Sequence, residues 1–321
     1  MATFAKRGSK YRAQVTLDGR RESATFSTKG EAQAWAKEKE AGRLPSALAS
    51  TPVRKILQRY AAEVAPKKRG FQWELLRINA WCKQAWVNTP IAAFDRVAIA
   101  SWRDQRLKSV SPGTVLREMG LLAAVLEVAR RDWGHIEANP IKDVRRPTAP
   151  ADRRRRVTDS EIEALQICLD YAPGQVPTSK SQLIAVMMLL AIETGMRSGE
   201  LCGLTWPHVH ATHVHLPRTK NGTARDVALT PQAQKLLATI PRTGPDVFGI
   251  TASQRDGLFR KARDRSGVTD LHFHDFRSEA IFRLSKRLNV LELARQVGHN
   301  DIRSLNFYYN VTGAELAAKL A

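Results

Sequence analysis

The chain has 321 residues, of which 43% are hydrophobic and 26% charged, an ordinary balance for a globular protein of two or three domains. Its 51 Lys and Arg against 31 Asp and Glu leave a net charge of +20, which predicts a polyanionic partner, most simply a nucleic acid, although ribosomal and membrane-surface proteins can be as basic. Three scattered cysteines exclude a disulfide framework and a cysteine-based zinc cage.

Targeting and membrane signals are missing from the printed sequence. The first residues have no apolar stretch of the kind that signal peptides need, and the longest apolar run, 183–192, is too short to span a bilayer. The few cysteines fit a reducing compartment. We therefore expect a soluble cytoplasmic protein with no membrane partner.

Residues 1–43 are expected to form a three-stranded sheet with one helix. Residues 10–17 alternate between apolar and polar side chains, and Asp18-Gly19 makes a tight turn into a second alternating run over 21–27. A short strand around 3–6 would complete the sheet. Residues 27–42 then read as a capped helix whose apolar face packs on the sheet through Ala32, Trp35 and Ala36.

The polar face of this small sheet carries Lys10 and Arg12. Such a face suits insertion into a DNA groove, and it is equally typical of a surface that is merely solvated. The alternation by itself leaves both interpretations open.

Residues 43–53 have the composition of a linker, and from Val53 the periodicity becomes helical, within the segment 51–147. Four antiparallel helices in a compact bundle are expected there, with Pro112 in the first turn of the last one. The first two helices are indicated by apolar stripes, and the last two are expected over 95–108 and 111–131. The first stripe consists of Val53, Ile56, Leu57 and Tyr60, and the second of Trp73, Leu76, Trp81 and Trp86.

Basic side chains in and after this bundle are candidates for contacts with DNA phosphates. Residues 147–158 hold two prolines and a run of four arginines, which cannot pack a core and would repel itself unless an anion lay beside it. We interpret this segment as a linker that crosses DNA. The candidates are Lys67, Lys68, Arg69, Arg103, Arg106, Arg153, Arg154, Arg155 and Arg156.

Residues 157–321 begin with a capping box, Thr158 and Glu161, which opens a helix. The run 181–195 is apolar nearly all round and predicts a buried central helix. Two strands over 212–220 and 224–229 follow, and they place Lys220 at the tip of a hairpin. Short helices are expected from Thr230 onward, so the chain as a whole is expected to be mainly α with small β elements, an α+β fold.

Six side chains in this last segment form a pattern that can break a phosphodiester without a metal ion. A phosphodiester under attack gathers negative charge on its oxygens, and guanidinium and imidazole donors can stabilise that charge, while a tyrosine supplies the nucleophile. Each short motif alone is common by chance, but the ordered set is specific. In chain order the six are Arg197, Lys220, His274, Arg277, His299 and Tyr308.

This order and spacing resemble the tyrosine recombinase (phage integrase) family, in which the tyrosine follows the last His or Trp by nine residues, as Tyr308 follows His299. The resemblance is specific over 157–310 and looser over 1–147. It implies an arm-type DNA-binding domain over 1–43, which favours DNA contact by that sheet, a core-binding helical domain over 51–147, and a mixed α/β catalytic domain over 157–321.

The resemblance also implies roles for the six residues. Arg197 and Arg277 would grip the phosphate, His274 and His299 would donate to its oxygens, Lys220 would protonate the leaving 5' oxygen, and Tyr308 would form a 3'-phosphotyrosine. Glu200 would orient Arg197, and Tyr309 is the fallback nucleophile. Thr219 and Arg225 are read as neighbours without a role, and His272 as structural. The family's second His after the H-x-x-R box is replaced here by Ser278, outside the six.

No cofactor is expected, because the bond energy is kept in the phosphotyrosine, and no metal, because the H-x-H of His272 and His274 has no accompanying Cys or acidic cluster. We expect a site-specific recombinase that integrates or excises a mobile element, with a DNA invertase of the same family as the alternative. A type IB topoisomerase, a non-cleaving DNA-binding regulator and a zinc-dependent nuclease are weaker rivals.

The expected partners are double-stranded DNA at core and arm sites, other copies of the chain in a tetramer, and DNA-bending accessory proteins. Residues 313–320 predict a short amphipathic helix, too small to be stable alone, that docks on a neighbouring protomer. A bacterial, nucleoid-associated location would follow.

Overall fold

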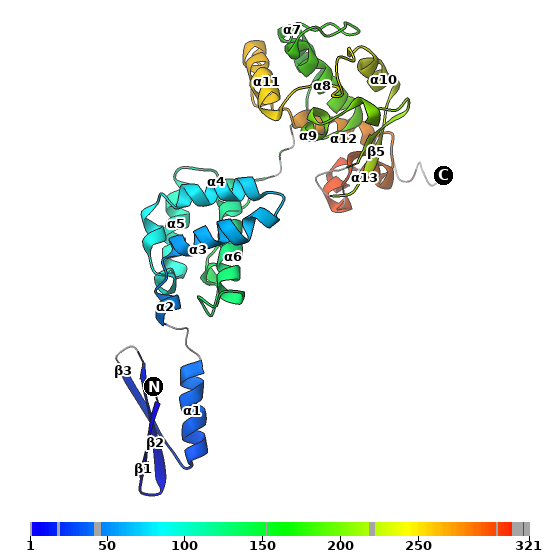
Figure 1. Cartoon of the computed structure of the whole chain (residues 1–321). Helices are drawn as coiled ribbons and strands as arrows, with labels where there is room; N and C mark the ends of the chain where they lie inside the picture. Colours follow the sequence, from blue (N-terminus) through cyan, green and yellow to red (C-terminus); the bar gives the residue numbers. More distant parts are fainter. Residues whose placement is uncertain are drawn as a thin grey trace. The chain divides into compact units, whose positions relative to one another are not determined.

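A computed structural model of the chain describes residues 2–17, 20–41, 46–151, 153, 155–217, 222–299, 301–309 and 317. The chain divides into two compact units, Met1–Asp152 and Arg153–Ala321 (Figure 1). Helices predominate and the strands form two small antiparallel sheets within the described ranges, so the expected α+β class is confirmed. None of the described helices is long and apolar enough to cross a membrane.

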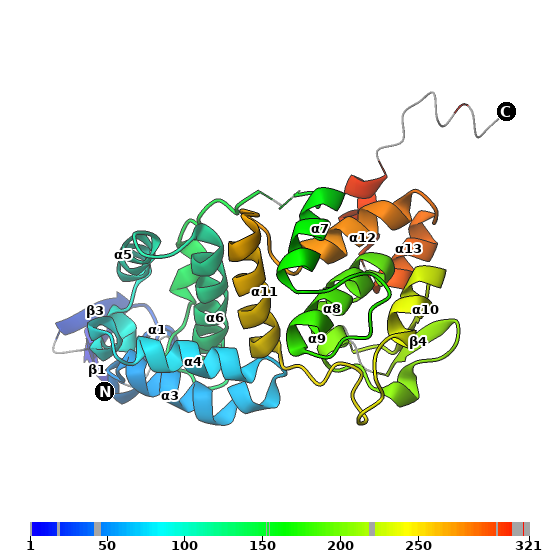
Figure 2. The same cartoon turned by 90° about the horizontal axis from the view of Figure 1, so that it is seen from above.

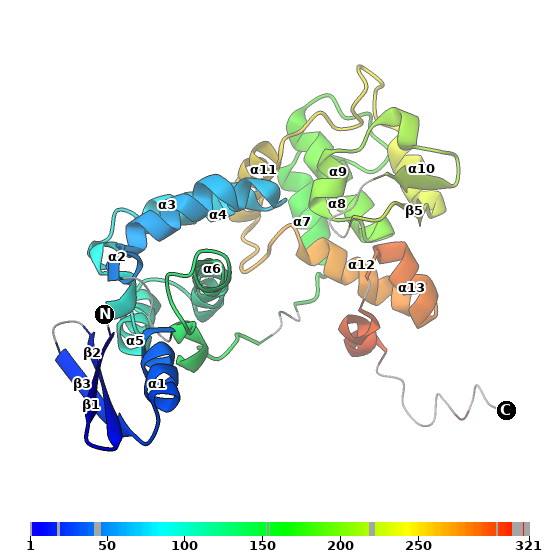
Figure 3. The same ribbon diagram turned by 60° about the horizontal axis from the view of Figure 1, so that its bottom comes forward.

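The N-terminal sheet has the strand order β1-β2-β3, all antiparallel, and α1 packs against β2 (Figure 3). Its elements are β1 Ala2–Arg7, β2 Lys10–Leu17, β3 Arg20–Phe26 and α1 Lys29–Ala41. Ala13 and Val15 of β2 and Ala32 and Ala36 of α1 are buried, because small side chains on both surfaces let the helix approach the strands. The predicted alternation in β2 and the predicted helix are confirmed, whereas the Asp18-Gly19 turn lies outside the described residues.

The rest of the first unit is a bundle built on four longer helices, α3 to α6. Residues 46–49, predicted as part of a linker, form one turn of helix instead. The elements are α2 Ser46–Ala49, α3 Val53–Glu63, η1 Ala65–Lys67, α4 Phe71–Trp81, η2 Ala85–Asn88, η3 Ile91–Ala93, α5 Arg96–Leu107, α6 Pro112–Arg131 and η4 Pro140–Asp143.

Local signals in the sequence set the ends of these helices. Asp95 caps α5 by accepting from the backbone N–H groups of Val97 and Ala98, and Ser111 caps α6 ahead of Pro112. The stripe predicted for α3, from Val53 to Tyr60, is fully buried.

The stripe predicted for α4 is wrong. Trp73 and Leu76 are 40% and 72% exposed, whereas Ile78 and Trp81 are buried. At 100° per residue Leu76 lies on nearly the opposite side of the helix from Ile78, so α4, which is covered on one side only, buries Ile78 and leaves Leu76 exposed. Trp86 lies beyond the end of α4, in η2, where it meets Trp81 edge-on with ring centroids 6.1 Å apart.

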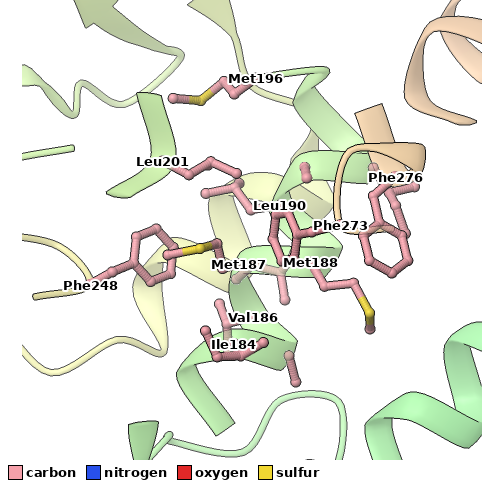
Figure 4. Packing of buried hydrophobic residues seen from close by; sticks show 14 of the residues in the cluster. Ile184, Val186, Met187, Met188, Leu190, Met196, Leu201, Phe248, Phe273 and Phe276 are labelled. Carbon is pink, nitrogen blue, oxygen red and sulfur yellow. The ribbon is translucent and has the colours of Figure 1, made fainter. Parts of the chain in front are cut away.

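The second unit is organised around α8, which Figure 2 shows among α7, α9, α10 and α12. Met187 and Met188 of α8 are fully buried among apolar neighbours (Figure 4), so the prediction of a buried central helix is confirmed. The elements are α7 Asp159–Cys168, α8 Lys180–Thr194, α9 Ser198–Cys202, η5 Trp206–His208, β4 His213–Leu216, β5 Arg225–Ala228, α10 Pro231–Ala238, α11 Ala252–Ser266, α12 Asp275–Ser285, α13 Val290–Val297 and η6 Ile302–Tyr308.

The two strands of this unit pair in the register His213 to Ala228 and Leu216 to Arg225. They are shorter than predicted, and residues 218–221, which include Lys220, lie outside the described residues. The predicted capping box at Thr158 and Glu161 is present at the start of α7.

One of the predicted DNA contacts, Arg106, is partly buried and pairs with a carboxylate in the interior of the bundle. Its guanidinium donates two hydrogen bonds, of 2.9 and 3.0 Å, to the carboxylate of Glu118, which is fully buried in α6 and also pairs with Arg77 at 3.0 Å. A buried carboxylate needs such partners, because removing one leaves part of its charge uncompensated.

We predict that Arg106→Met lowers the free energy of unfolding of the bundle by about 1–3 kcal/mol, the usual effect of losing hydrogen bonds to a charged group. Urea unfolding followed by tryptophan fluorescence reports it, because Trp81 and Trp102 lie in this core. Arg69→Met, at an exposed position, is the control and should leave the midpoint unchanged. Equal midpoints for both variants, with DNA binding lost only in Arg106→Met, would show that Arg106 serves DNA rather than the fold.

Candidate active site

Two helix ends meet at the centre of the site. Helices α8 and α13 are each followed by a capping glycine, Gly195 and Gly298, both with φ of +67°, a left-handed conformation that glycine adopts without strain. A Cβ on Gly195 would lie 3.0 Å from a methyl carbon of Val297, so the two ends are in close contact. Carbonyls at helix C-termini lack intrahelical partners and carry partial negative charge, so this junction attracts cations.

Arg277 occupies this junction from the first turn of α12. Its Nη1 donates to the carbonyl of Gly195 and its Nη2 to the carbonyl of Val297 at 2.8 Å. The side chain is buried, and burial together with the positive charge of Arg197 lowers its pKa to about 9, so the guanidinium stays protonated at neutral pH. A permanent cation is thereby fixed beneath the surface of the site.

Arg197 lies directly before α9 and is held by the same junction. Its Nη2 donates to the carbonyl of Gly298 at 2.8 Å and its Nη1 to Oε1 of Glu200 at 3.0 Å. The Glu200 carboxylate also accepts from the backbone N–H of Arg197 at 2.8 Å. The expected pairing of Arg197 with Glu200 is therefore present.

Arg225, interpreted from the sequence as a neighbour without a role, is part of this cluster. Its Nη1 and Nη2 each donate to one oxygen of Glu200 at 2.8 Å, and its side chain is 9% exposed. Burial raises the pKa of Glu200, but the bonds from Arg225 and Arg197 outweigh it and hold that pKa below its usual value. The sequence held a signal that Arg225 is buried, because strand alternation puts it on the same face as the buried Val227.

His274 lies at the N-terminus of α12 and lines a cleft of about 610 Å³ together with Arg197. His208 and His215 line the same cleft, and the rings of these two lie 5.8 Å apart. The sequence reading missed both, although two H-x-H repeats over 208–215 could have drawn attention to them. Nδ1 of His215 lies 2.7 Å from a carboxylate oxygen of Asp226.

His299 follows Gly298 and is half-buried. Burial, and then the positive charges of Arg277, Arg197 and Arg225, lower its pKa to about 4, and His274 acts in the same direction. His299 is therefore a neutral imidazole at neutral pH, able to donate one hydrogen bond. These interactions also place His299 and His274 within electrostatic reach of one another.

The two adjacent tyrosines differ in their surroundings. The hydroxyl of Tyr309 donates to the carbonyl of Leu288 at 2.6 Å, and burial raises its pKa. Tyr308 ends η6 and interacts electrostatically with Arg277. Both pack against a small apolar cluster that includes Leu305. The structure thus brings Tyr308 together with Arg197, His274, Arg277 and His299, while Lys220 lies outside the described residues.

The remaining candidates at this end of the chain are easily placed. His272 is exposed, and its backbone N–H donates to Asp275 at 2.8 Å. In the part of the chain that the structure describes, no group of three or more His, Cys, Asp or Glu side chains is arranged to hold a metal ion.

The arginines before α7 lie against carboxylates of their own unit. Arg153 donates to Asp275 at 2.8 Å and to Asp270 at 2.9 Å, and the bonds with Asp275 and then Asp270 raise its pKa. The other two described members of the run are paired in the same way, Arg155 with Glu161 and Arg156 with Glu279. Arg154 lies outside the described residues, and DNA contact by this run stays a prediction.

The other predicted DNA contacts fall into two groups. Lys10, Lys67 and Arg69 are exposed. The others have protein partners, with bonds from Arg12 to Ser23 at 2.8 Å, from Lys68 to Glu74 at 3.1 Å, and from Arg103 to Asp104 at 2.8 Å, in addition to the pair of Arg106 with Glu118.

Comparison with known proteins agrees with this site. Residues 155–315 match the model of the phage integrase family. A Haemophilus influenzae homologue of the integrase/recombinase class is 36% identical over 335 residues, covering 98% of this chain and 89% of that protein. The shufflon-specific DNA recombinase of Escherichia coli is 35% identical, covering 83% of this chain and 71% of that protein. The chain belongs to the phage integrase family, and it is a DNA breaking and rejoining enzyme, a tyrosine recombinase.

Solved structures show the same fold. The chain resembles a lambda integrase dimer bound to a COC' core site, with a TM-score of 0.69 and 18% identity over 96% of this chain and 94% of that one. A lambda integrase tetramer bound to a Holliday junction gives a TM-score of 0.69 and 17% identity, with 98% of each chain covered.

We predict that His299 titrates near pH 4, whereas a histidine in the unfolded chain titrates near 6.5. Because the folded pKa is the lower one, the unfolded chain takes up the proton first as the pH falls. The contribution of His299 to stability is therefore complete above about pH 6.5 and is lost as the pH falls to about 4. NMR titration of ¹³C-labelled histidine checks this, with H299Q to assign the signal. A midpoint near 6.5 would contradict it.

Proposed function

We propose that this recombinase exchanges DNA strands at specific sites through a 3'-phosphotyrosine intermediate, and that the reaction integrates or excises a mobile element. The main support is the convergence of two arginines, two histidines and Tyr308 at the junction of α8 and α13. Several fixed cations around one position favour the charge that builds up on a phosphodiester under attack. DNA is the partner that the net charge of +20 favours.

The proposed roles follow from exposure and charge. Arg197, 18% exposed at the cleft, donates to a phosphate oxygen, while Arg277 supports it from below as a buried cation. A guanidinium has five N–H donors, so the bonds that hold each arginine do not exhaust it. His274 and the neutral His299 donate to the remaining oxygens.

Tyr308 is the proposed nucleophile, and the positive charge of Arg277 favours its phenolate as it attacks. Tyr309 is the weaker candidate, because its hydroxyl is already bonded to the Leu288 carbonyl. Lys220 is proposed to protonate the departing 5' oxygen. The phosphotyrosine keeps the energy of the broken bond, so rejoining requires no ATP.

Inversion is the second candidate outcome. It is supported by the likeness to the shufflon-specific DNA recombinase, 35% identical over 83% of this chain. A plasmid carrying two recombination sites distinguishes the outcomes, since sites in direct repeat give excision and sites in inverted repeat give inversion.

We further propose three functional parts: an arm-binding domain over 1–43, a core-binding domain over 51–147 and a catalytic domain over 157–321. Their assembly would be a tetramer on two DNA segments, as in the solved lambda integrase tetramer on a Holliday junction. Residues 313–320, of which the structure describes only 317, would exchange a helix between protomers. Cytoplasmic location, nucleoid association when bound, and DNA-bending accessory proteins complete the proposal.

We predict that Tyr308→Phe still binds its site but forms no covalent adduct with a nicked suicide substrate, because it lacks the attacking oxygen. Tyr309→Phe should still form the adduct and lose about 1 kcal/mol of stability with its bond to Leu288. Adducts are counted on denaturing gels. EDTA is present, because charged side chains rather than a metal ion are proposed to stabilise the phosphate. An adduct in Tyr308→Phe but not in Tyr309→Phe would reverse the assignment of the nucleophile. Loss of adduct formation in EDTA would show that the reaction requires a metal ion.

We predict that deleting residues 1–43 abolishes binding to arm sequences and leaves weak cleavage at core sites. The reason is that the sheet and α1 bury their own apolar face through Ala13, Val15 and Ala32, and so form a separate small module. Gel shifts with arm and core oligonucleotides measure it. Unchanged arm binding would indicate that this module contacts protein instead.

A further inference from the structure

Two described arginines, Arg197 and Arg225, bond the carboxylate of Glu200, and the proposed reaction gives Arg225 no role. Arg225 begins β5, opposite Leu216 of β4, and its two terminal nitrogens donate to the two oxygens of Glu200 at 2.8 Å each. These two parallel hydrogen bonds form a bidentate pair, which is the strongest geometry between an arginine and a carboxylate. With 9% of its side chain exposed, Arg225 is poorly placed to contact DNA itself.

Glu200 serves both arginines at once. Its Oε1 accepts from Arg225 at 2.8 Å and from Arg197 at 3.0 Å, and its Oε2 accepts from Arg225 and from the backbone N–H of Arg197 at 2.8 Å each. The position of this carboxylate therefore sets the position of Arg197. Without Arg225, both oxygens of Glu200 could accept hydrogen bonds from the Arg197 guanidinium. Such a bidentate pair would draw Arg197 away from a phosphate.

Arg225 also shapes the turn that carries His299. A Cβ on Gly298 would lie 2.8 Å from Nη1 of Arg225, so the guanidinium passes directly over the glycine. The carbonyl of Gly298 binds Arg197 at 2.8 Å, which closes a ring of contacts from Arg225 through Glu200 and Arg197 to Gly298.

Strand β5 is fixed to this turn at its other end as well. The side chain of Gln296 accepts from the backbone N–H of Ala228 at 2.9 Å and donates to the Ala228 carbonyl at 3.0 Å and to the Thr194 carbonyl at 3.2 Å. Strand β5, which follows Lys220 in sequence, is thus attached at both ends to the segment that positions Arg197 and His299.

We propose that Arg225 is a positioning residue for DNA cleavage: by gripping Glu200 and lying over Gly298, it fixes Arg197 and the His299 turn in the geometry that receives the phosphate, without contacting DNA. This inference rests on the proposed roles of Arg197 and His299. A small displacement of such groups is costly, since a misplacement of about 1 Å can slow a reaction roughly 100-fold.

The test compares Arg225→Met and Arg225→Lys in the full-length protein. We expect Arg225→Met to form the covalent adduct roughly 100-fold more slowly in single turnover, with site binding by gel shift within about twofold of the wild type. Lysine keeps the charge but not the forked geometry of the guanidinium, so Arg225→Lys should recover only part of the rate and remain roughly tenfold slower than the wild type. Arg283→Met is the matched control, since Arg283 pairs with a buried carboxylate, Glu279 at 3.0 Å, away from this ring.

A second readout separates positioning from a general loss of stability. The charge of Arg225 is one of the causes that keep the pKa of His299 low. In NMR titration the His299 midpoint should rise in Arg225→Met and stay low in Arg225→Lys. If Arg225→Met does not fold, Arg225→Lys decides alone, and a wild-type rate in that variant overturns the proposal.

The remaining outcomes are equally decisive. Arg225→Met with wild-type cleavage and an unchanged His299 midpoint would show that Arg225 positions nothing. Loss of binding with an unchanged cleavage rate at saturating protein would make it a DNA contact. Tyr308→Phe is measured in parallel to test the proposed site itself. If that variant still forms the adduct, the proposed site is wrong. If it forms none and the Arg225 variants behave as wild type, only the inference about Arg225 is wrong.

Discussion

The buried carboxylate of Glu200 is the group on which the geometry of the site depends. Three arginines, Arg197, Arg225 and Arg277, lie close enough to influence one another, and in a poorly solvated site their mutual repulsion would drive them apart. Glu200 offsets part of this charge and bonds two of the three directly. Carbonyls at the ends of α8 and α13 hold the third. The result is a concentration of positive charge that is fixed before any substrate arrives.

Pre-fixed charge matters because the site needs no reorganisation when negative charge develops on a phosphate. The same charge acts on its neighbours. Together with burial, which is the larger cause, it keeps His299 neutral, with a pKa of about 4, and it interacts with the hydroxyl of Tyr308. A general acid or base needs a group that changes charge near neutral pH, so His299 is better suited to donating a hydrogen bond than to transferring a proton.

The net charge of +20 is not equivalent to a DNA-binding surface. Arg106 compensates Glu118 inside the bundle, and Arg153 and Arg156 are paired with Asp275 and Glu279. For the three members of the arginine run that the structure describes, Arg153, Arg155 and Arg156, the protein's own carboxylates supply the anion. Arg153 and Arg156 therefore already have carboxylate partners that any DNA phosphate would have to share or replace, whereas Lys10, Lys67 and Arg69 are exposed.

The sequence by itself determined most of the longer helices before Thr230, the strand alternation of 10–17, the buried α8 and the family, because periodicity, capping residues and motif spacing are local or serial properties. The buried side of α4 was predicted wrongly from the sequence, because apolar residues occur all round that helix and only packing decides which side is buried. Arg225 was also given no role, although the pairing of Glu200 with Arg197, three residues apart, was predictable. Arg225 reaches Glu200 across 25 residues, and Gly298 receives Arg197 across 101. Only the tertiary structure brings such distant residues together, because the convergence of α8, α13 and β5 depends on how the whole domain packs.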